Sequence, residues 1–478
     1  MKKLLLALVA APCLATAADP QNNDQGHTRF WDYYNPYPSN YIGSREWWEG
    51  EALLGDFWGL RNMVDDAGVE ISATYGNNIA GNVTGGKSQG FTYADNLLFG
   101  VELDMKKLIG WDGLSITVSG LNRNGTSLSQ DYIGNQFTVQ QIYGGSAVMF
   151  YGLWFDQKFL DDKVSLKAGR FATGDDFASS PIYWLYMNNG IDGNPQSLPV
   201  NTQFSAYPWA VWGARVRIDP TPEYNAMFGV YQVSDRVFTR NYHGLDWSMR
   251  SNDGVLLISQ FGWTPEFFKR PVEADAASNE GKAVNAPLVG STSSGKSVAD
   301  GKGGKAVTPP TMKGLPGHYW FGAYYSPWQF SQFGTDQKAS NSYGFYWHAD
   351  QMLWQEAPGS DQGLTLWSAV TLSPQQNIAR LPFQVNGGLV YKGLIPYRDQ
   401  DYTTFGVIYG KFSTNWGDVT EANGQGRADY ELVFEWGYKI QITKFAFVQP
   451  DIQYVINPGG TNSIPNALVL GAQMGVTF

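Results

Sequence analysis

The sequence predicts an all-β transmembrane barrel of about sixteen antiparallel strands with a short N-terminal helical segment. The last twelve residues, 467–478, carry an apolar side chain at every second position and end on Phe478. Alternation with a period of two is typical of a β-strand with one apolar face. The closing strand of an outer-membrane barrel has this pattern, with its apolar face toward lipid. Taken alone, this strand is also compatible with the edge of a soluble β-sandwich.

A second strand, over residues 430–443, repeats the pattern more sharply. One face is apolar at seven successive positions, namely Tyr430, Leu432, Phe434, Trp436, Tyr438, Ile440 and Ile442. The other face includes Glu431, Glu435 and Lys439. Strands in soluble proteins usually have about five or six residues, whereas strands of about ten residues recur along this chain, as in membrane barrels. The repetition therefore favours the barrel over the sandwich.

The first residues have the form of a secretory signal peptide, which we assign to residues 1–17. Two lysines precede the apolar stretch 4–11, and an Ala-x-Ala cleavage site ends at Ala17. Cys13, the only cysteine, leaves with this peptide, so we expect no disulfide and no thiolate chemistry in the mature chain. After it, no apolar run reaches the about 18 residues of a membrane helix.

The composition agrees with a barrel. Aromatic residues make up 15% of the chain and there are 55 glycines, which suit interfacial aromatic girdles and tight turns. The formal net charge is -10, and removal of the signal peptide takes away two further lysines. An acidic chain of this kind argues against nucleic acid as a partner.

Residues 18–66 are predicted to form an N-terminal extended segment that ends in a short helix over about 52–66, where Leu53, Phe57 and Leu60 follow helical spacing. The barrel domain then covers residues 67–478. Its predicted strands lie near 69–80, 97–105, 114–123, 145–157, 163–171, 209–219, 223–233, 254–264, 318–326, 342–355, 363–373, 382–393, 402–414, 429–443, 445–456 and 467–478. Their number is even, as bacterial barrels require.

The connections alternate between long loops and short turns, as expected for a barrel with loops outside and turns at the periplasm. The long connections are near 124–144, 172–208, 234–253 and 415–428. One segment does not fit this pattern. The composition of residues 271–313 predicts a flexible, low-complexity insertion, and the strand count predicts that the stretch 271–316 lies on the periplasmic side. Either this stretch is a periplasmic extension or one strand is miscounted.

Five groups of residues then occur in a specific order and spacing. They are Leu54–Arg61 with Gly68 and Ala80–Asn82; Val139–Gly144; Ala168–Arg170, Gly174–Ala178 and Gly193–Pro195 with Tyr207–Pro208 and Trp212–Arg217; Gly314–Tyr319 with Ala349–Gln351; and Gln449–Tyr454 with Asn457–Gly460. On these residues the chain resembles the carbohydrate-selective porins of the OprB type, from residue 54 almost to its end. The resemblance implies a sixteen-stranded outer-membrane barrel whose narrowed lumen conducts ions and admits sugars passively, without energy coupling.

The chain departs from this family at two places. The insertion 271–313 is longer than the family leads us to expect. Asp192 stands where many members have a cysteine before Gly-Asn-Pro. The second departure lies in the large third loop, so it concerns the fine selectivity of the pore and leaves the fold unaffected.

A sugar pore needs hydrogen-bond partners at its narrowest point, and charged partners strengthen such bonds. Binding must also stay weak enough for the solute to leave. Arg123 is the first candidate because it shares inward parity with Ser115, Thr117 and Ser119 and precedes a long loop. The alternative is an arginine that pairs with a wall carboxylate and only shapes the pore. Four further charged residues have inward parity as lumen lining: Glu102, Lys167, Arg215 and Arg217.

The connection 172–208 is the predicted constriction loop. Its candidate solute contacts are Asp175, Asp176, Trp184, Asn188, Asn189 and Asn194. Asp175 and Asp176 can instead cap a turn or pair with lumen arginines, and Trp184 can serve packing alone. These structural roles are the alternatives to direct contact with a sugar.

No catalytic residue, metal site or cofactor is predicted, and an enzyme is not expected. The four histidines, His27, His243, His318 and His348, are far apart without ligand spacing. No Gly-x-Ser-x-Gly nucleophile elbow is found. The predicted function is facilitated diffusion of mono- and small oligosaccharides across the bacterial outer membrane into the periplasm. The alternatives are a general porin for small polar solutes and, from another class, an outer-membrane barrel enzyme.

The expected partners follow from this function. They are sugars, outer-membrane lipid, lipopolysaccharide and the barrel assembly machinery, which would recognise the C-terminal strand ending at Phe478. The barrel is expected to be a monomer or a homotrimer.

Overall fold

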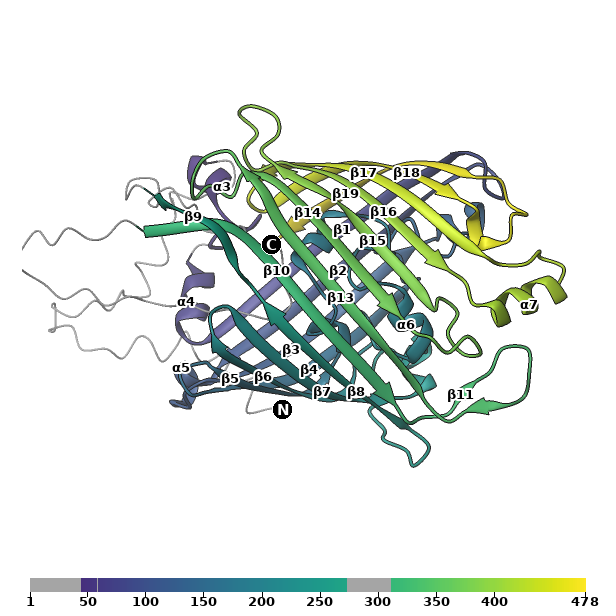
Figure 1. Ribbon diagram of the computed structural model, residues 1–478. Helices are drawn as coiled ribbons and strands as arrows, with labels where there is room; N and C mark the ends of the chain where they lie inside the picture. Colours follow the sequence, from purple (N-terminus) through teal and green to yellow (C-terminus); the bar gives the residue numbers. More distant parts are fainter. Residues whose placement is uncertain (1–43, 58, 273–310) are drawn as a thin grey trace, which may run out of the picture.

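The computed structural model describes residues 44–57, 59–272 and 311–478. Its principal strands are β1 Val69–Thr84, β2 Gly90–Asp104, β3 Leu114–Gly125, β4 Ala147–Phe159, β5 Val164–Phe171, β6 Val211–Thr221, β7 Tyr224–Val233, β8 Gly254–Trp263, β10 Thr311–Ser326, β13 Ser342–Gln355, β14 Gly363–Leu372, β15 Phe383–Lys392, β16 Tyr402–Lys411, β17 Tyr430–Thr443, β18 Ala446–Ile456 and β19 Ala467–Thr477. Each coincides with a predicted strand. They form an antiparallel barrel that closes where β1 pairs with both β2 and β19 (Figure 1), so the prediction of a sixteen-stranded barrel is confirmed.

A further strand, β9 Glu266–Val272, follows β8 and pairs with the first part of β10 as a hairpin that extends the wall. This hairpin lies at the same end of the barrel as the C-terminus (Figure 1). The strands that flank the predicted insertion therefore lie on the side that parity assigned, and no strand was miscounted. Residues 273–310 and the predicted signal peptide lie outside the described residues.

Three short helices, α3 Arg45–Glu49, α4 Leu60–Asp66 and α5 Met105–Ile109, lie at this end as well (Figure 1). The helix predicted over 52–66 is therefore wrong in its first half. The backbone N–H of Leu53 donates to the carbonyl oxygen of Thr477 at 2.8 Å, which ties this stretch to the end of β19. Gly59, before α4, has a φ of 86°, a left-handed conformation that glycine adopts without strain. No helix in the described ranges is long and apolar enough to cross a membrane.

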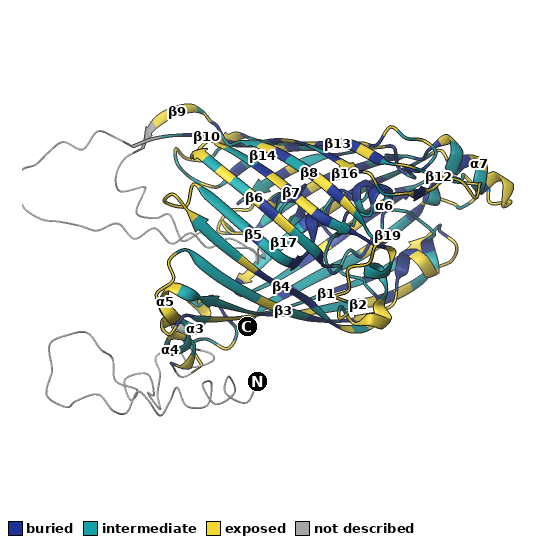
Figure 2. Ribbon diagram, turned by 90° about the horizontal axis from the view of Figure 1, so that it is seen from below, coloured by how far each residue is buried: buried dark blue, intermediate teal, exposed yellow. Residues whose placement is uncertain are grey.

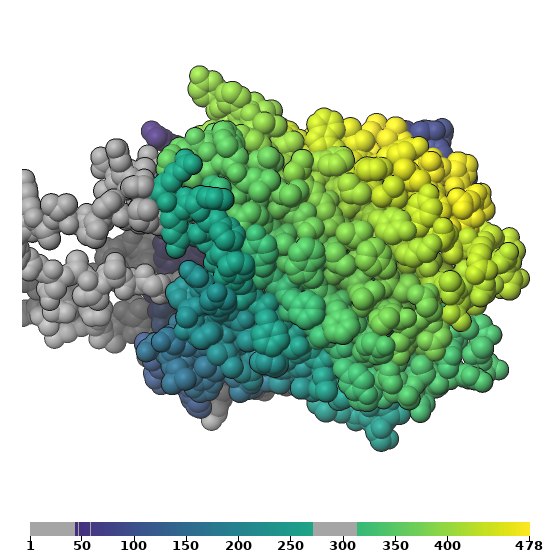
Figure 3. All heavy atoms as spheres, in the orientation of Figure 1, coloured from purple at the N-terminus to yellow at the C-terminus, as the bar shows by residue number. Residues whose placement is uncertain are grey.

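Side chains alternate between the two surfaces of the barrel wall, and Figure 2 shows buried and exposed residues alternating along the strands. The outward residues Trp436 and Leu470 are 53% and 46% exposed, whereas the inward residues Glu431 and Glu435 are 0% and 1% exposed. The parity assigned to β17 and β19 from the sequence is therefore correct. On the face drawn in Figure 3, side chains of the green strands close the wall into a continuous surface.

The hydrophobic core lies inside the barrel because two connections fold into it. We call residues 172–210, between β5 and β6, the constriction loop, and residues 126–146, between β3 and β4, the companion loop. The constriction loop contains η3 Thr173–Asp175, η4 Pro181–Leu185 and α6 Ser197–Thr202, and the companion loop contains η2 Ser129–Ile133. Fully buried side chains from both loops join the core: Phe137, Phe177, Tyr183, Tyr186, Leu198 and Phe204.

The remaining short elements lie in other connections. They are η5 Asp235–Phe238, η6 Arg240–Tyr242, β11 Phe330–Ser331, β12 Lys338–Ala339, α7 Thr414–Ala422 and η8 Pro458–Gly460. The hairpin of β11 and β12 and helix α7 project from the end opposite α3 to α5 (Figure 1).

Candidate functional site in the barrel lumen

The constriction loop leaves the wall at β5, crosses the lumen and is fixed to the opposite wall by hydrogen bonds. A hydrogen bond of 2.8 Å joins the hydroxyl of Tyr183 to Nδ1 of His348 on β13. The indole N–H of Trp367 on β14 donates to the Tyr186 hydroxyl at 2.8 Å. The backbone N–H of Ser197 donates to an amide oxygen on β15 at 2.8 Å. Buried polar groups need such partners, so these bonds fix the course of the loop across the pore.

The companion loop runs beside the constriction loop and pairs with it. The backbone N–H of Asn189 donates to the carbonyl oxygen of Thr138 at 2.8 Å, and the N–H of Gln141 donates to that of Met187 at 3.0 Å. The inward course of this second loop could not be predicted, because its composition does not distinguish it from an exposed loop. The lumen is therefore narrowed by two loops where one was expected.

Glycine on β16 lets the constriction loop approach the wall closely. A Cβ atom added at Gly406 would lie 2.7 Å from Tyr186 and 2.9 Å from Ile191, both fully buried. Separations below 3 Å force a neighbour to move, and packed interiors have little free space. The absence of a side chain at Gly406 thus allows the constriction loop to lie close to the wall and farther from the pore axis.

We expect Gly406→Val to displace the constriction loop toward the pore axis and to lower single-channel conductance, because its side chain overlaps two packed residues. The matched control is Gly81→Val, at an outward position on β1 where an added Cβ meets only contacts of 3.5 Å or more. Equal conductance of the two variants and the native protein would refute this role of Gly406.

Arg123 is buried in the lumen wall at 3% exposure. Its Nε donates to Oδ1 of Asn96 at 3.1 Å, and the hydroxyl of Tyr207 donates to the same oxygen at 2.9 Å. The guanidinium carbon lies 4.7 Å from the centre of the Tyr207 ring, in cation–π contact. No ion pair to Arg123 occurs among residues 44–57, 59–272 and 311–478, so a partner carboxylate in direct contact is not what orients it.

Asp192 of the constriction loop interacts electrostatically with two cations of the wall, Arg123 on β3 and Lys439 on β17. Burial raises the pKa of Asp192 well above its ordinary value, while these two cations act in the opposite direction. Its side chain is 6% exposed, and its Oδ1 has no hydrogen-bond partner in the described part of the chain. Two walls and the loop thus bring a carboxylate and two cations into one region of the lumen.

A second charged group joins the root of the constriction loop to the wall. Asp176 pairs with Nζ of Lys167 at 3.2 Å and with Nη2 of Arg215 at 3.3 Å, and Arg215 also reaches Asp156 at 3.1 Å. Burial alone would raise the pKa of Asp176, but the charges of Lys167 and Arg215 outweigh it and hold the pKa below its ordinary value. The inward parity of Lys167 and Arg215 agrees with this geometry, in which they hold the loop.

Asp175 faces the other way, toward β4. It accepts a hydrogen bond from the hydroxyl of Tyr151 and one from the backbone N–H of Ala172 at 3.1 Å. Burial raises the pKa of Asp175 to about 6, although Lys167 and the Tyr151 hydrogen bond counteract it. Asp175 therefore takes up a proton in a range where an exposed aspartate stays ionised.

This raised pKa gives a pH dependence with a defined sign. Because the folded pKa lies above that of an unfolded aspartate, the contribution of Asp175 to stability is complete below about pH 4 and is lost as the pH rises to about 6. The difference in thermal stability between the native protein and Asp175→Asn should fall over this interval and stay constant above it. A difference that does not vary with pH would contradict the assignment.

The other predicted site residues are dispersed. Arg217 pairs with Asp219 at 2.8 Å, and Glu102 is half-buried and accepts from Thr117 at 3.4 Å. Asn188 is fully buried. Asn194 donates to three carbonyl oxygens of its own loop, and Asn189 pairs through its backbone with Thr138. Trp184 is half-buried, and its indole N–H has no hydrogen-bond partner within the described residues. The structure therefore brings together Arg123 with Asp192, and Lys167 with Arg215 and Asp176.

Distance in the sequence did not indicate that two of the histidines share a partner. His318 and His348 are thirty positions apart, yet both hydrogen-bond to Asp350, at 2.7 and 2.8 Å. Both reach Asp350 because this residue lies opposite His318 in the antiparallel pairing of β10 and β13 and two positions after His348 on the same strand. No group of three or more histidine, cysteine or acidic side chains suited to a metal ion is found in the part of the chain that the structure describes.

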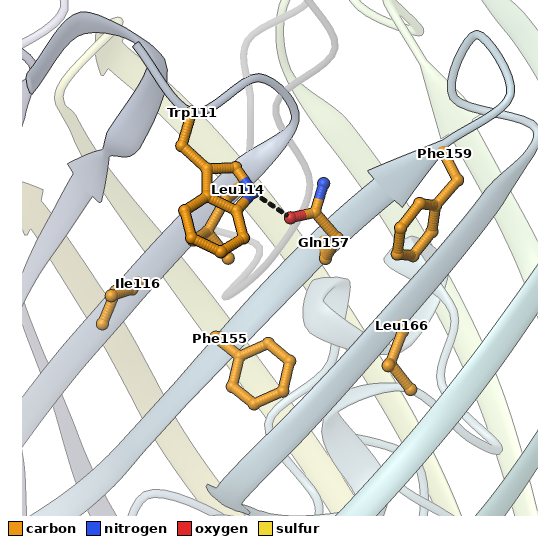
Figure 4. A pocket seen from close by; sticks show the side chains of 7 residues that line it. All are labelled: Trp111, Leu114, Ile116, Phe155, Gln157, Phe159 and Leu166. Atoms are coloured by element: carbon orange, nitrogen blue, oxygen red, sulfur yellow. Dashed lines mark hydrogen bonds between the residues drawn. The ribbon is translucent and has the colours of Figure 1, made fainter. Parts of the chain in front are cut away.

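One apolar pocket lies on the outer wall and is not part of this pathway. Figure 4 shows it between β3, β4 and β5, with Phe155 and Leu166 on its floor and the indole of Trp111 bonded to Gln157 at 2.8 Å. All these strand residues have outward parity. The pocket is therefore a feature of the surface that faces away from the lumen.

Comparison with known proteins agrees with this arrangement. Residues 88–478 match the family described as "Carbohydrate-selective porin, OprB family". Porin B of Pseudomonas aeruginosa is 25% identical over 461 residues, which cover 89% of this chain and 91% of that protein. The structure of Pseudomonas putida OprB at high pH matches with a TM-score of 0.75 and 23% identity, and its low-pH structure with 0.55 and 20%. Each match covers 90% of this chain and 99% of the other.

Proposed function

This chain belongs to the OprB family of carbohydrate-selective outer-membrane porins, and we propose that mono- and small oligosaccharides cross it by facilitated diffusion past Arg123 and Asp192. The family consists of transport channels, so the alternative of an outer-membrane barrel enzyme is wrong. Which side chains touch the sugar, and how large a sugar passes, are the parts that this proposal adds.

The observation that carries the proposal is the electrostatic interaction between Arg123 of the wall and Asp192 of the constriction loop in one region of the lumen. Arg123 projects from the wall and Asp192 from the loop, and one oxygen of Asp192 lacks a hydrogen-bond partner among the described residues. Sugar hydroxyls both donate and accept, so a guanidinium and a carboxylate suit them, and bonds to charged groups are the stronger ones. Each side chain exposes only a few per cent of its surface, as expected where two walls approach closely. Contact is then limited to one or two atoms, which keeps binding weak enough for release.

Swelling of liposomes that contain the purified protein tests this proposal. Monosaccharides and disaccharides should enter faster than amino acids or linear polyols of equal hydrodynamic size. Rates that depend on solute size alone would indicate a general porin for small polar solutes and would reject the selectivity assigned to these residues.

The outer wall supports two further parts of the proposal. Large apolar side chains such as Trp436, Phe321 and Leu470 are exposed on it, which suits contact with membrane lipid and lipopolysaccharide. We also propose that the barrel assembly machinery recognises β19 with its terminal Phe478. The barrel acts as a monomer or a homotrimer, and mass measurement in mild detergent distinguishes these two states.

A further inference from the structure

We propose that Glu435 on β17 is a positioning residue, whose carboxylate holds the constriction loop at the place where Asp192 can face Arg123. Glu435 points into the lumen and is 1% exposed. One of its oxygens accepts the backbone N–H of Met187, and both oxygens lie 3.3 Å from the N–H of Asn188. No lysine or arginine in the described part of the chain forms an ion pair with it. Its partners are two backbone amides of the loop and the carboxyl group of Asp451 on β18.

Burial of a carboxyl group costs free energy unless the group is hydrogen-bonded. The hydrogen bonds from the two loop amides to Glu435 therefore stabilise the position of the loop. The oxygens of Glu435 belong to a side chain on a rigid strand. Because they accept hydrogen bonds from two successive backbone N–H groups, they restrict movement of the loop in more than one direction. Glu431, four residues earlier on the same face, does the same for the companion loop. Its two oxygens accept the N–H groups of Gln136 at 2.7 Å and Phe137 at 2.8 Å.

The position of Asn188 is transmitted directly to Asp192. The carbonyl oxygen of Asn188 accepts the backbone N–H of Asp192 at 2.8 Å, and its side-chain oxygen accepts that of Gly190 at 2.8 Å. A tight turn therefore connects the residue held by Glu435 to the carboxylate at the constriction. The side-chain nitrogen of Asn188 also donates to Gln453 on β18 at 2.8 Å, which adds a second attachment to the wall.

Two substitutions of Glu435 separate its role as a hydrogen-bond acceptor from a role of its charge in the pore. Glu435→Ala removes the acceptor, whereas Glu435→Gln keeps one acceptor oxygen at nearly the same place. Glu70→Ala is the matched control, because Glu70 on β1 also has inward parity but is exposed and distant in sequence from either loop. The proposal predicts that the glutamine variant behaves like the native protein and the alanine variant does not.

The first readout is block of single-channel current by glucose, which rests on the proposed function. Glu435→Ala should raise the dissociation constant for block by about threefold to tenfold, the factor that one hydrogen bond of ordinary strength represents. Glu435→Gln and Glu70→Ala should leave it unchanged. Equal impairment of the glutamine and alanine variants would overturn the proposal, because the charge would then matter and the acceptor would not.

The second readout is hydrogen exchange, which needs no sugar and so separates failure of this proposal from failure of the sugar site. In the native protein the amides of Met187 and Asn188 should be among the slowest of the constriction loop, and Glu435→Ala should accelerate them while Gln136 and Phe137 change less. Fast exchange of both amides in the native protein would overturn the proposal even if Glu435→Ala fails to assemble.

Discussion

Replacement of Arg123 by alanine is expected to weaken block of the channel by glucose by about tenfold to a hundredfold, because a hydrogen bond to a charged group contributes about 1.5–3 kcal/mol. The guanidinium is the cation that faces Asp192 from the β3 wall, and its loss leaves Lys439 as the cation that acts on this carboxylate. The lumen then carries one positive charge less at its narrow part. The current should therefore also become more selective for cations. Both quantities are measured on single channels in a planar bilayer.

Arg427→Ala is the matched control for this variant. Arg427 lies in the connection after α7 and its side chain is 50% exposed. Among the residues that the structure describes, it pairs with the surface carboxylates Asp418 and Glu421. Sugar block and ion selectivity should be those of the native protein. Loss of block in the Arg427 variant, or unchanged block in the Arg123 variant, would show that the constriction is not at Arg123.

The second large effect is expected at Arg215, which joins two carboxylates at the root of the constriction loop. Arg215→Met leaves Asp176 and Asp156 facing each other with only Lys167 to compensate, and loss of one partner from a buried ion pair costs about 3–5 kcal/mol. The barrel should survive because its strand pairing is untouched. We expect a clearly lower temperature for the loss of the folded, fast-migrating form on semi-native gels.

A rescue variant distinguishes charge from packing at this position. Asp176 keeps its ion pair with Lys167 in Arg215→Met, whereas Asp156 loses its pair with Arg215. Asp156→Asn in the Arg215→Met background removes this uncompensated carboxylate and should restore part of the lost thermal stability. Lys106→Met, which breaks a fully exposed pair with Asp112, should have little effect. Identical melting of Arg215→Met and the native protein would mean that this ion-pair group does not hold the loop.

The strands could be predicted because lipid and lumen impose opposite demands on successive residues. On β17 this gives the alternation from Tyr430 to Ile442, and the same rule placed Arg215 and Lys167 inward. The alternation along a strand does not indicate which inward residues contact a loop. Glu431 and Glu435 have the same inward parity as Arg215, yet nothing in the sequence indicates that backbone amides of two loops donate hydrogen bonds to them.

The spacing of apolar residues along the chain does not predict the structure at the end of the barrel or inside the lumen. Leu53 and Phe57 fit helical periodicity, but the hydrogen bond from Leu53 to the end of β19 outweighs local preference. The approach of His318 to His348 and the inward course of the companion loop depend on strand pairing far along the chain. The sequence marks Asp192 only as a departure from the family pattern, because the cations that act on it, Arg123 and Lys439, come from strands that are remote in sequence.

Titration of the native single-channel current with glucose tests most directly whether sugar binds in the constriction. We expect a reduction of current that saturates with concentration, because sugar occupies a site between Arg123 and Asp192 that ions must also pass. A reduction that only follows the viscosity of the solution, without saturation, would contradict a sugar site in the constriction.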